Sequence, residues 1–297
     1  MEKISINLDL PASLKKYEEE QLEELRNNEF VQQYLIDNNM NDEDLRKNLP
    51  LFVMMIRELQ ECEACGGLAT CKKSERGYIP VLKKKRFVDF AKKPCKYMVH
   101  ELEMRKKEAY YLYQPFTRQQ MSITLDTMKV FHEDPSYMNA FAQILDYVLE
   151  PQGKGIYLYG SVGVGKTYLM MALCNEFASQ GKTVAFVNVT EFLLEHKTKI
   201  DYELLERVKN ADFMVLDDIG QESVTAYHRD EILFPLLNDR MMMGKATCFT
   251  SNFDFAGLQE HFCVNIYNDR EELKALRVME RIKALSKEVN LIGKSRR

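Results

Sequence analysis

The stretch that decides the fold is GIYLYGSVGVGKTYLMMALC, residues 155–174, where a glycine-rich turn separates an apolar run from an amphipathic one. Residues 160–167 match the phosphate-binding pattern G-x-x-x-x-G-K-[ST]. The β-rich run at 156–159 predicts a strand before the turn. Apolar residues recur at helical spacing after it, so the turn is expected to open a helix whose positive N-terminus faces phosphate. A chance match to the pattern would not predict this strand–turn–helix context.

Each position of this loop has a physical role in binding ATP. Its glycines permit turn conformations in which successive N–H groups point at phosphate oxygens. Lys166 is expected to reach the β- and γ-phosphates, and the Thr167 hydroxyl to ligate Mg²⁺. The predicted nucleotide-binding residues are the whole loop, namely Gly160, Ser161, Val162, Gly163, Val164, Gly165, Lys166 and Thr167.

Two further strand-like runs end on polar side chains that suit ATP chemistry. The run ADFMVLDDI, residues 211–219, stops on Asp217, a predicted Mg²⁺-side ligand, and Asp218, a predicted base or orienter for attacking water. The run KATCFTSNF, residues 245–253, ends near Asn252, which is predicted to hold that water. The alternative is that these polar residues only end strands and start turns.

Composition fits a globular chain. With 297 residues and 45% hydrophobic content, the chain is long enough for one good core and a smaller module. The longest apolar run, residues 49–56, is far too short to cross a membrane. The amino terminus has no continuous apolar core after a basic start, so no secretory signal is expected. Seven cysteines, an odd number, also favour thiols or metal ligands, and the predicted location is cytoplasmic.

Charge divides the chain into parts. Residues 1–61 hold seven Lys or Arg against fourteen Asp or Glu, whereas residues 62–110 hold thirteen against six. The acidic part contains two amphipathic runs, at about 12–38 and 42–60, that predict helices. These helices are interpreted as a small bundle, or, through the apolar ridge LPLFVMMI, as a surface that binds a partner.

The basic part contains a cysteine cluster with zinc-ligand spacing. Cys62 and Cys65 are spaced to hold one tetrahedral Zn²⁺, with Cys71 and Cys95 available as the remaining ligands. His100 is the alternative for the fourth ligand. Redox chemistry at the first two cysteines is the other alternative, although no βαβ context surrounds them.

Between these cysteines, GYIPVLKKKRFVDF predicts a β-hairpin with a basic turn. The run Lys83, Lys84, Lys85 and Arg86 has the charge to neutralise nucleic-acid phosphates. A solvated turn is the alternative, because most charge runs are solvated surface.

Four segments together resemble a known family. GSVGVGKT, MVLDDIG, CFTSN and the closing LRVMERIKAL are similar to the AAA+ ATPases of the bacterial replicative helicase loaders, the DnaC/DnaI group, over roughly residues 130–297. The cysteine module and acidic helices in front narrow the resemblance to the DnaI type. Relatives can use a histidine in the zinc site, whereas the corresponding turn here has Tyr78, so Cys71 is assigned instead.

The resemblance implies a function for each part of the chain. An amino-terminal domain, residues 1–110, is expected to bind the hexameric replicative helicase and to hold zinc. A linker at 111–134 is expected to lead to an AAA+ domain at 135–297 that binds ATP and single-stranded DNA. Together they are expected to place the helicase ring on the strand during initiation or restart of replication, alongside other primosome proteins.

The expected fold is a parallel α/β core with helices on both faces. Only sixteen residues follow Arg281, too few for the helical lid of many AAA+ proteins. A neighbouring subunit or the helicase is therefore expected to close over the nucleotide, which predicts a slow, assembly-dependent ATPase. The resemblance places an arginine finger at Arg281, offered in trans, while Leu276, Met279 and Ile282 are expected to share the apolar face of its helix.

Three other functions compete with this interpretation. A transposition helper ATPase of the IstB type shares the core motifs but is not expected to carry the zinc module. A nucleotide kinase needs an arginine-rich lid and an acceptor pocket, and neither is apparent in the sequence. An adaptor with a relic ATP site is disfavoured by the intact Lys166, Thr167, Asp217 and Asp218.

Overall fold

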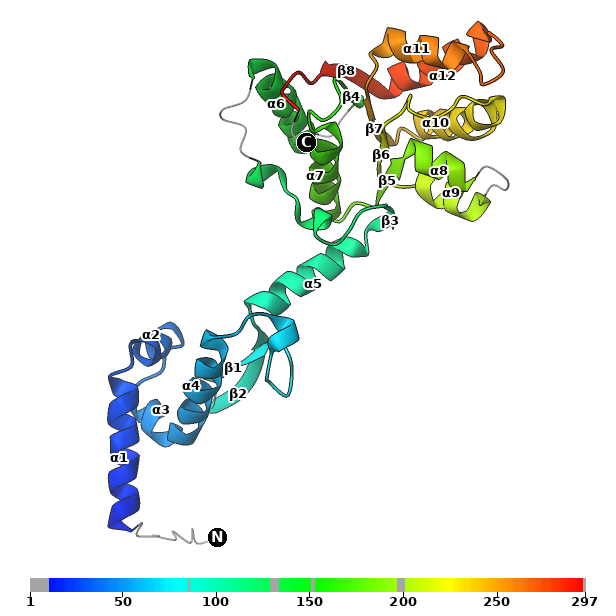
Figure 1. Cartoon of the computed structure of the whole chain (residues 1–297). Coiled ribbons are helices and arrows are strands. Elements are labelled where there is room, and N and C mark those ends of the chain that lie inside the picture. The colour runs from blue at the N-terminus through cyan, green and yellow to red at the C-terminus, as the bar shows by residue number, and fades with distance from the viewer. Residues whose placement is uncertain (1–10, 85, 129–133, 151–152, 197–200, 296–297) are drawn as a thin grey trace. The chain divides into compact units, whose positions relative to one another are not determined.

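A computed structural model describes residues 11–84, 86–128, 134–150, 153–196 and 201–295 (Figure 1). The chain divides into two compact units, Met1–Leu102 and Glu103–Arg297. Residues 1–10, on which the expected absence of a secretory signal rests, lie outside the described residues. So does Lys85, which belongs to the predicted basic turn. No helix in the described part of the chain is long and apolar enough to cross a membrane.

The first unit combines short helices with a β-hairpin. Its elements are α1 (Ala12–Arg26), α2 (Glu29–Asp37), α3 (Asp42–Lys47), α4 (Leu49–Glu63), the 3₁₀ turn η1 (Leu68–Thr70), and the antiparallel strands β1 (Tyr78–Lys84) and β2 (Val88–Pro94). Helix α5 (Lys96–Glu108) spans the division between the units.

The two long helices expected in the acidic part are each broken in two. Asn28 starts α2 by accepting a hydrogen bond from the Val31 N–H, so the helix expected over 12–38 is interrupted there. Asn48 ends α3 and precedes α4, whose second residue is Pro50. Proline cannot donate the backbone hydrogen bond that a helix interior needs, so α4 restarts there.

The core of the first unit joins these helices to the hairpin. Leu22, Val31, Phe52 and Leu82 are fully buried in one apolar cluster. Tyr34 on α2 adds a polar connection, because its hydroxyl donates to the Leu82 carbonyl at 2.6 Å and accepts from the Leu82 N–H at 2.7 Å. One face of the hairpin is thereby fixed against the helices.

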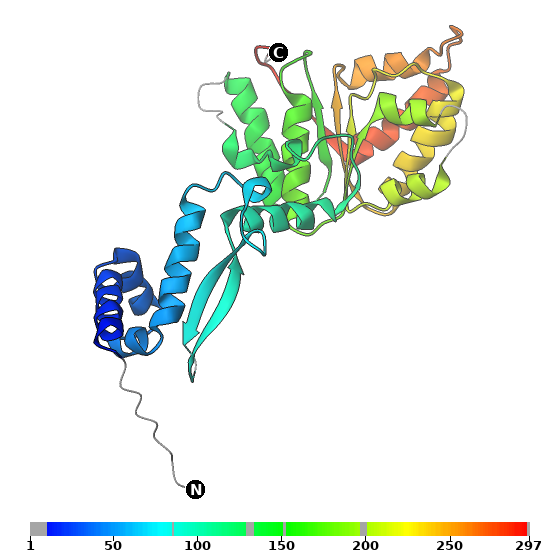
Figure 2. The same ribbon diagram turned by 60° about the horizontal axis from the view of Figure 1, so that its bottom comes forward.

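The second unit is built on a six-stranded parallel sheet (Figure 2). The strand order is β3-β5-β6-β7-β4-β8, and every described pairing within it is parallel. The strands are β3 (Tyr111–Tyr113), β4 (Gly155–Tyr159), β5 (Val184–Asn188), β6 (Phe213–Asp217), β7 (Ala246–Ser251) and β8 (Ser286–Asn290).

Helices cover both faces of this sheet, as Figure 1 shows. Along β6, Phe213 and Val215 join one core cluster, whereas Met214 and Leu216 join the other, because successive strand residues point to opposite faces. The first cluster contains α6 (Pro135–Leu149) and α7 (Lys166–Ser179). The second contains α8 (Val189–Glu195), α9 (Tyr202–Lys209), the π-helical segment η4 (Tyr227–Leu233), α10 (Phe234–Met242), α11 (Phe255–Cys263) and α12 (Glu272–Leu285). The predicted α/β fold is confirmed.

The sheet edges come from segments that the sequence did not identify as strands. Strand β3 and the turns η2 (Gln120–Ser122) and η3 (Leu125–Thr127) lie in the interval assigned to a linker, and both turns contact α7. Strand β8 follows α12 and pairs with β4. In the part of the chain that is described, the residues after α12 therefore extend the sheet and form no helical lid.

Candidate functional site

The glycine-rich loop lies between β4 and α7, where the sequence predicted it. Gly163 and Gly165 have φ angles of 84° and 103°, in the left-handed region that favours glycine. Gly160 has a second constraint, since a Cβ there would lie 2.2 Å from the Leu291 carbonyl oxygen. The Leu291 N–H donates to Tyr159 O at 2.8 Å, so the segment after β8 packs directly against the start of the loop.

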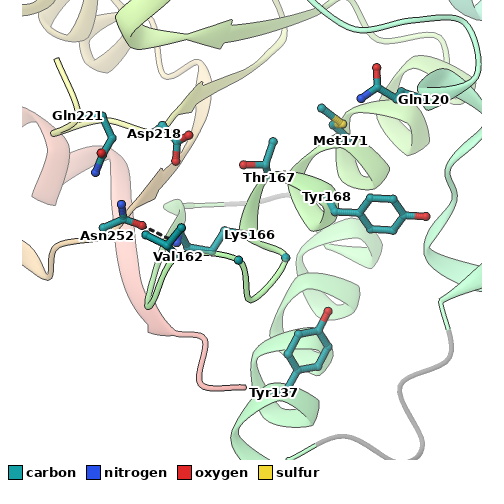
Figure 3. Close-up of a pocket in the computed structure, with 12 residues that line it drawn as sticks. Gln120, Tyr137, Val162, Lys166, Thr167, Tyr168, Met171, Asp218, Gln221 and Asn252 are labelled. Atoms are coloured by element: carbon teal, nitrogen blue, oxygen red, sulfur yellow. Dashed lines mark hydrogen bonds between the residues drawn. The ribbon is translucent and has the colours of Figure 1, made fainter. Parts of the chain in front are cut away.

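The loop borders a pocket of about 660 Å³ (Figure 3). Predicted site residues in its lining are Val162, Gly163, Gly165, Lys166, Thr167, Asp218 and Asn252. Sequence reasoning missed five others, Gln120, Tyr137, Tyr168, Met171 and Gln221. Figure 3 places Asp218, Gln221 and Asn252 on one side of the loop, and the two tyrosines with Met171 and Gln120 on the other.

These two sides have different chemistry. The side with Asp218 and Asn252 is polar and stands at the carboxyl ends of β6 and β7. The opposite side offers the aromatic rings of Tyr137 and Tyr168 and the thioether of Met171, which are surfaces for a flat apolar group. Charged phosphates suit the first side and a purine ring suits the second.

Lys166 is buried at the base of the pocket and held by three oxygen atoms. Its ammonium donates to Gly160 O at 2.8 Å, to Ser161 O at 3.0 Å and to Asn252 Oδ1 at 2.8 Å. Through the last bond, Asn252, which follows β7, contacts Lys166, which follows the neighbouring strand β4. Phosphate oxygens carry negative charge and bind an ammonium more strongly than these neutral acceptors do.

Asp217 joins three elements at the floor of the site. It is 2% exposed, its Oδ1 accepts from the Thr250 hydroxyl on β7 at 2.7 Å, and its Oδ2 accepts from the Thr167 hydroxyl on α7 at 3.3 Å. Burial raises the pKa of Asp217 from 3.8 to about 6, against the lowering effect of the Thr250 hydrogen bond. The two residues predicted to hold Mg²⁺ are thus adjacent, and their oxygen atoms have the chemistry that Mg²⁺ prefers.

Asp218 turns away from the strand into the pocket. Its φ of 56° is left-handed, which aspartate tolerates better than most residues. Its N–H donates to Thr250 Oγ1 at 2.8 Å, so one hydroxyl orients both aspartates. Thr250 was not predicted as a site residue, although its place at a polar strand end was the available signal.

Glu222 is a second buried acid close to the site. It is 4% exposed, and its Oε2 accepts from the Gly220 N–H at 2.7 Å. Burial raises its pKa to about 7. Because the Gln221 N–H also donates to Asp218 O at 3.1 Å, the segment from Asp218 to Glu222 forms a closed turn that presents Gln221 to the pocket.

Arg281 lies away from the pocket of its own chain. On α12 its guanidinium is 5.1 Å from the centre of the Phe234 ring, and its Nε donates to Asn238 Oδ1 at 3.4 Å. Arg277 lies 4.4 Å from the same ring. Met279 and Ile282 are buried as expected, but Leu276 is 41% exposed, so the prediction that it shares the apolar face is wrong. The buried face of α12 contains Ala275, Val278 and Met279 at spacings of three and four residues, and Leu276 lies one residue, or about 100° around the helix, beyond Ala275.

The four cysteines of the amino-terminal cluster lie around one cavity. Cys62, Cys65, Cys71 and Cys95 are half-buried thiols and line a cavity of about 270 Å³, which Tyr78 also borders. His100 is not in that lining. Among the residues that the structure describes, no three His, Cys, Asp or Glu side chains are grouped closely enough to hold a metal ion. The thiols are assembled in one place, and zinc binding by them stays a prediction.

Comparisons with known proteins cover both units. The profile of the IstB-like ATP binding protein family matches residues 103–297. The replicative helicase loader DnaI of Bacillus subtilis is 31% identical over 290 residues, which is 94% of this chain and 93% of that protein.

Solved structures of DnaI and of a putative primosome component are also similar to this chain. A crystal structure of DnaI is 32% identical and matches with a TM-score of 0.55 over 65% of this chain and all of that chain. A putative primosome component from Streptococcus pyogenes serotype M3 is 33% identical, with a TM-score of 0.53 over 65% of this chain and 98% of its own. The chain is therefore similar to these proteins in sequence and in fold.

The buried Asp217 predicts opposite effects of one substitution on stability and on metal binding. Above pH ~6 the carboxyl is ionised in both the folded and the unfolded chain, and burying this charge destabilises the folded state. Below pH ~4 the carboxyl is protonated in both states, so this destabilisation is lost. We expect Asp217→Asn to stabilise the nucleotide-free protein by about 1–3 kcal/mol at pH 8 and much less at pH 4. It should also weaken Mg²⁺-dependent ATP binding.

Urea unfolding at the two pH values and ATP titration with and without Mg²⁺ measure both effects. Asp212→Asn is the matched control, because at Asp212 burial, which raises the pKa, is outweighed by hydrogen bonds from Thr183 and Lys245 that hold the pKa down to about 2. That variant should be destabilised at pH 8. Equal destabilisation of both variants would contradict the account of Asp217.

Proposed function

Because the chain belongs to the IstB-like ATP-binding proteins and, among them, to the replicative helicase loaders of the DnaI type, we propose that it places a hexameric replicative helicase on single-stranded DNA in an ATP-dependent step. The observation that carries the proposal is the match to DnaI over 94% of the chain, which includes the acidic helices and the cysteine cluster. We propose the step acts in initiation or restart of replication, with other primosome proteins.

The competing transposition function lacks such support. The IstB-like profile matches residues 103–297 and includes no residue of the first unit, Met1–Leu102. A helper ATPase would need the second unit alone, whereas the DnaI likeness extends through both. Helicase loading is therefore preferred, and binding of the helicase is assigned to the first unit.

Hydrolysis of ATP is assigned to the residues around the pocket. Lys166 exchanges its bonds to Gly160 O, Ser161 O and Asn252 for bonds to phosphate oxygens. Thr167 and Asp217 would hold Mg²⁺, which would neutralise charge on the phosphates. Asp218 orients the attacking water or accepts its proton, and Asn252, once released by the lysine, holds that water.

The reaction is proposed to be slow until subunits assemble. The pocket is open on the side of Val162, which is 57% exposed, and the described residues provide no lid over it. A neighbouring subunit is proposed to close the site and to offer Arg281 in trans to the γ-phosphate. The contacts of Arg281 with Phe234 and Asn238 keep the guanidinium on the surface of α12, in reach of a neighbour.

Zinc is proposed as a structural ion of the first unit. Four thiols around one cavity are the donor set that tetrahedral Zn²⁺ prefers. Cys62, Cys65, Cys71 and Cys95 would hold it. The ion would connect the end of α4 to the segments on either side of the hairpin and so stabilise a unit with a small core.

Lys166 gives the direct test of the ATP site. We expect Lys166→Ala to remain folded and to co-elute with the replicative helicase of the same organism, while ATP hydrolysis falls at least about 10²-fold. Lys182→Ala, an exposed lysine of the same unit, is the control and should keep full activity. Undiminished hydrolysis in Lys166→Ala would overturn the site assignment, and absence of any helicase complex with the unaltered chain would overturn the loader function.

Arg281 tests assembly of the site between subunits. Arg281→Ala should bind ATP as the unaltered chain does but lose assembly-stimulated hydrolysis by roughly 10³-fold. Arg277→Ala is a matched control, because Arg277 contacts the same Phe234 ring and its loss removes similar packing. Mixing Arg281→Ala with Lys166→Ala should recover activity at interfaces that pair an intact pocket with an intact arginine. No recovery in assemblies proven to be mixed would count against a finger in trans.

Zinc content tests the cysteine cluster independently of activity. The chain purified without chelators should hold one zinc per molecule by atomic absorption, and Cys62→Ser/Cys65→Ser should hold none. Cys174→Ser/Cys263→Ser, which alters buried thiols of the second unit, should keep the metal. A metal-free chain with a fully folded first unit would remove zinc from the account.

A further inference from the structure

The tip of the β1–β2 hairpin presents two cations and one aromatic ring to solvent. Lys83 and Arg86 are exposed, and the Phe87 ring is 75% exposed. Lys85 lies outside the described residues and is not included. We call Lys83, Arg86 and Phe87 the hairpin tip; the hairpin is coloured cyan in Figure 2.

Strand register separates these residues from those that build the fold. Lys84 pairs with Val88 and Leu82 with Phe90, so all four side chains point to one face. That face packs on the helices, where Leu82 is buried and Lys84 forms an ion pair with Asp44 on α3. Lys83 pairs with Asp89 in the register and points to the opposite face. Among the described residues of the basic run, Lys84 therefore joins the hairpin to the helices, whereas Lys83 points away from them.

Phe87 has no comparable role in packing. None of the apolar clusters among the described residues includes it. Its recorded ring contact is with Arg86, whose guanidinium lies 5.8 Å from the ring centre. A phenylalanine this exposed contributes little buried apolar area to the fold and leaves its ring accessible to a ligand.

An exposed ring flanked by cations matches one kind of ligand. Proteins that bind single-stranded nucleic acid without sequence preference stack bases on aromatic rings and hold phosphates with nearby cations. A duplex hides its base faces in the stack, whereas a single strand leaves them accessible. An acidic protein surface would satisfy the cations but offers no flat partner for the ring.

We propose that the hairpin tip binds single-stranded DNA, with a base stacked on Phe87 and phosphates held by Lys83 and Arg86. This goes beyond the proposed function, which assigns only helicase binding to the first unit, and beyond the family resemblance, which implies DNA binding by the ATPase domain. It gives the first unit a DNA contact of its own.

The chain has no tryptophan, so Phe87→Trp creates a single fluorescent reporter at the tip of the full-length protein. We expect an oligothymidylate to quench this fluorescence saturably, because stacking on a base quenches indole emission. Tyr17→Trp, at a 59% exposed position on α1 in the same unit, is the matched reporter and should not respond. Heparin serves as a polyanion without bases.

Charge variants in the Phe87→Trp background test the phosphate contacts. Lys83→Glu/Arg86→Glu should weaken the titration at least about 10-fold and reduce its log–log salt slope by roughly 1.4, since each single-strand contact contributes about 0.7. Lys15→Glu/Lys16→Glu makes the same change in charge on α1 and should leave both unchanged. Without the tryptophan reporter, Phe87→Ala should weaken the binding of single-stranded DNA at the hairpin tip roughly 5- to 150-fold.

Three results would overturn the proposal. The first is no quenching of Phe87→Trp by the oligothymidylate, whether or not the DNA binds elsewhere on the chain. The second is equal quenching by heparin, which would reduce the tip to a general polyanion site. The third is quenching by the replicative helicase without DNA, which would make the tip a protein contact. None of these results would contradict helicase loading itself.

Discussion

The nucleotide site depends on one buried carboxylate. Asp217 ends the central strand β6 and receives hydroxyl hydrogen bonds from Thr250 on β7 and Thr167 on α7. These bonds fix the carboxyl ends of two strands and the start of the helix that follows the phosphate-binding loop. Because Thr250 also accepts from the Asp218 N–H, the orientation of the second acid depends on the same hydroxyl. A buried carboxylate such as Asp217 is stabilised when a cation binds to it, and Mg²⁺ is the cation proposed here.

The C-terminal segment has a comparable influence on the loop. Strand β8 pairs with β4, and its continuation approaches Gly160 so closely that no side chain fits there. The base of the site is therefore held by the sheet, and the described residues leave the pocket open above, as the proposed completion of the site by a neighbouring subunit requires.

The sequence predicted those parts of the site that have fixed spacing. The loop from Gly160 to Thr167 and the Asp217–Asp218 pair could be found because each must occur in order on one short segment. Tyr137, Gln120 and Glu222 have no such pattern, and only the fold brings them to the pocket or its supporting turn. Strand β3 was missed because it has only three residues, and β8 was missed because its sequence, SKEVN, is largely polar. The broken amino-terminal helices show that the Asn28 cap in one case and Pro50 in the other outweighed a continuous amphipathic pattern.

The central claim is that ATP held at this site drives a helicase ring onto a DNA strand. Retention of the replicative helicase on circular single-stranded DNA tests it most directly, since a ring cannot reach a circle without opening. The account predicts that the helicase stays on the circle through a high-salt wash only when this chain and ATP are both present. Equal retention of the helicase without the chain, or with the chain in the absence of ATP, would contradict it.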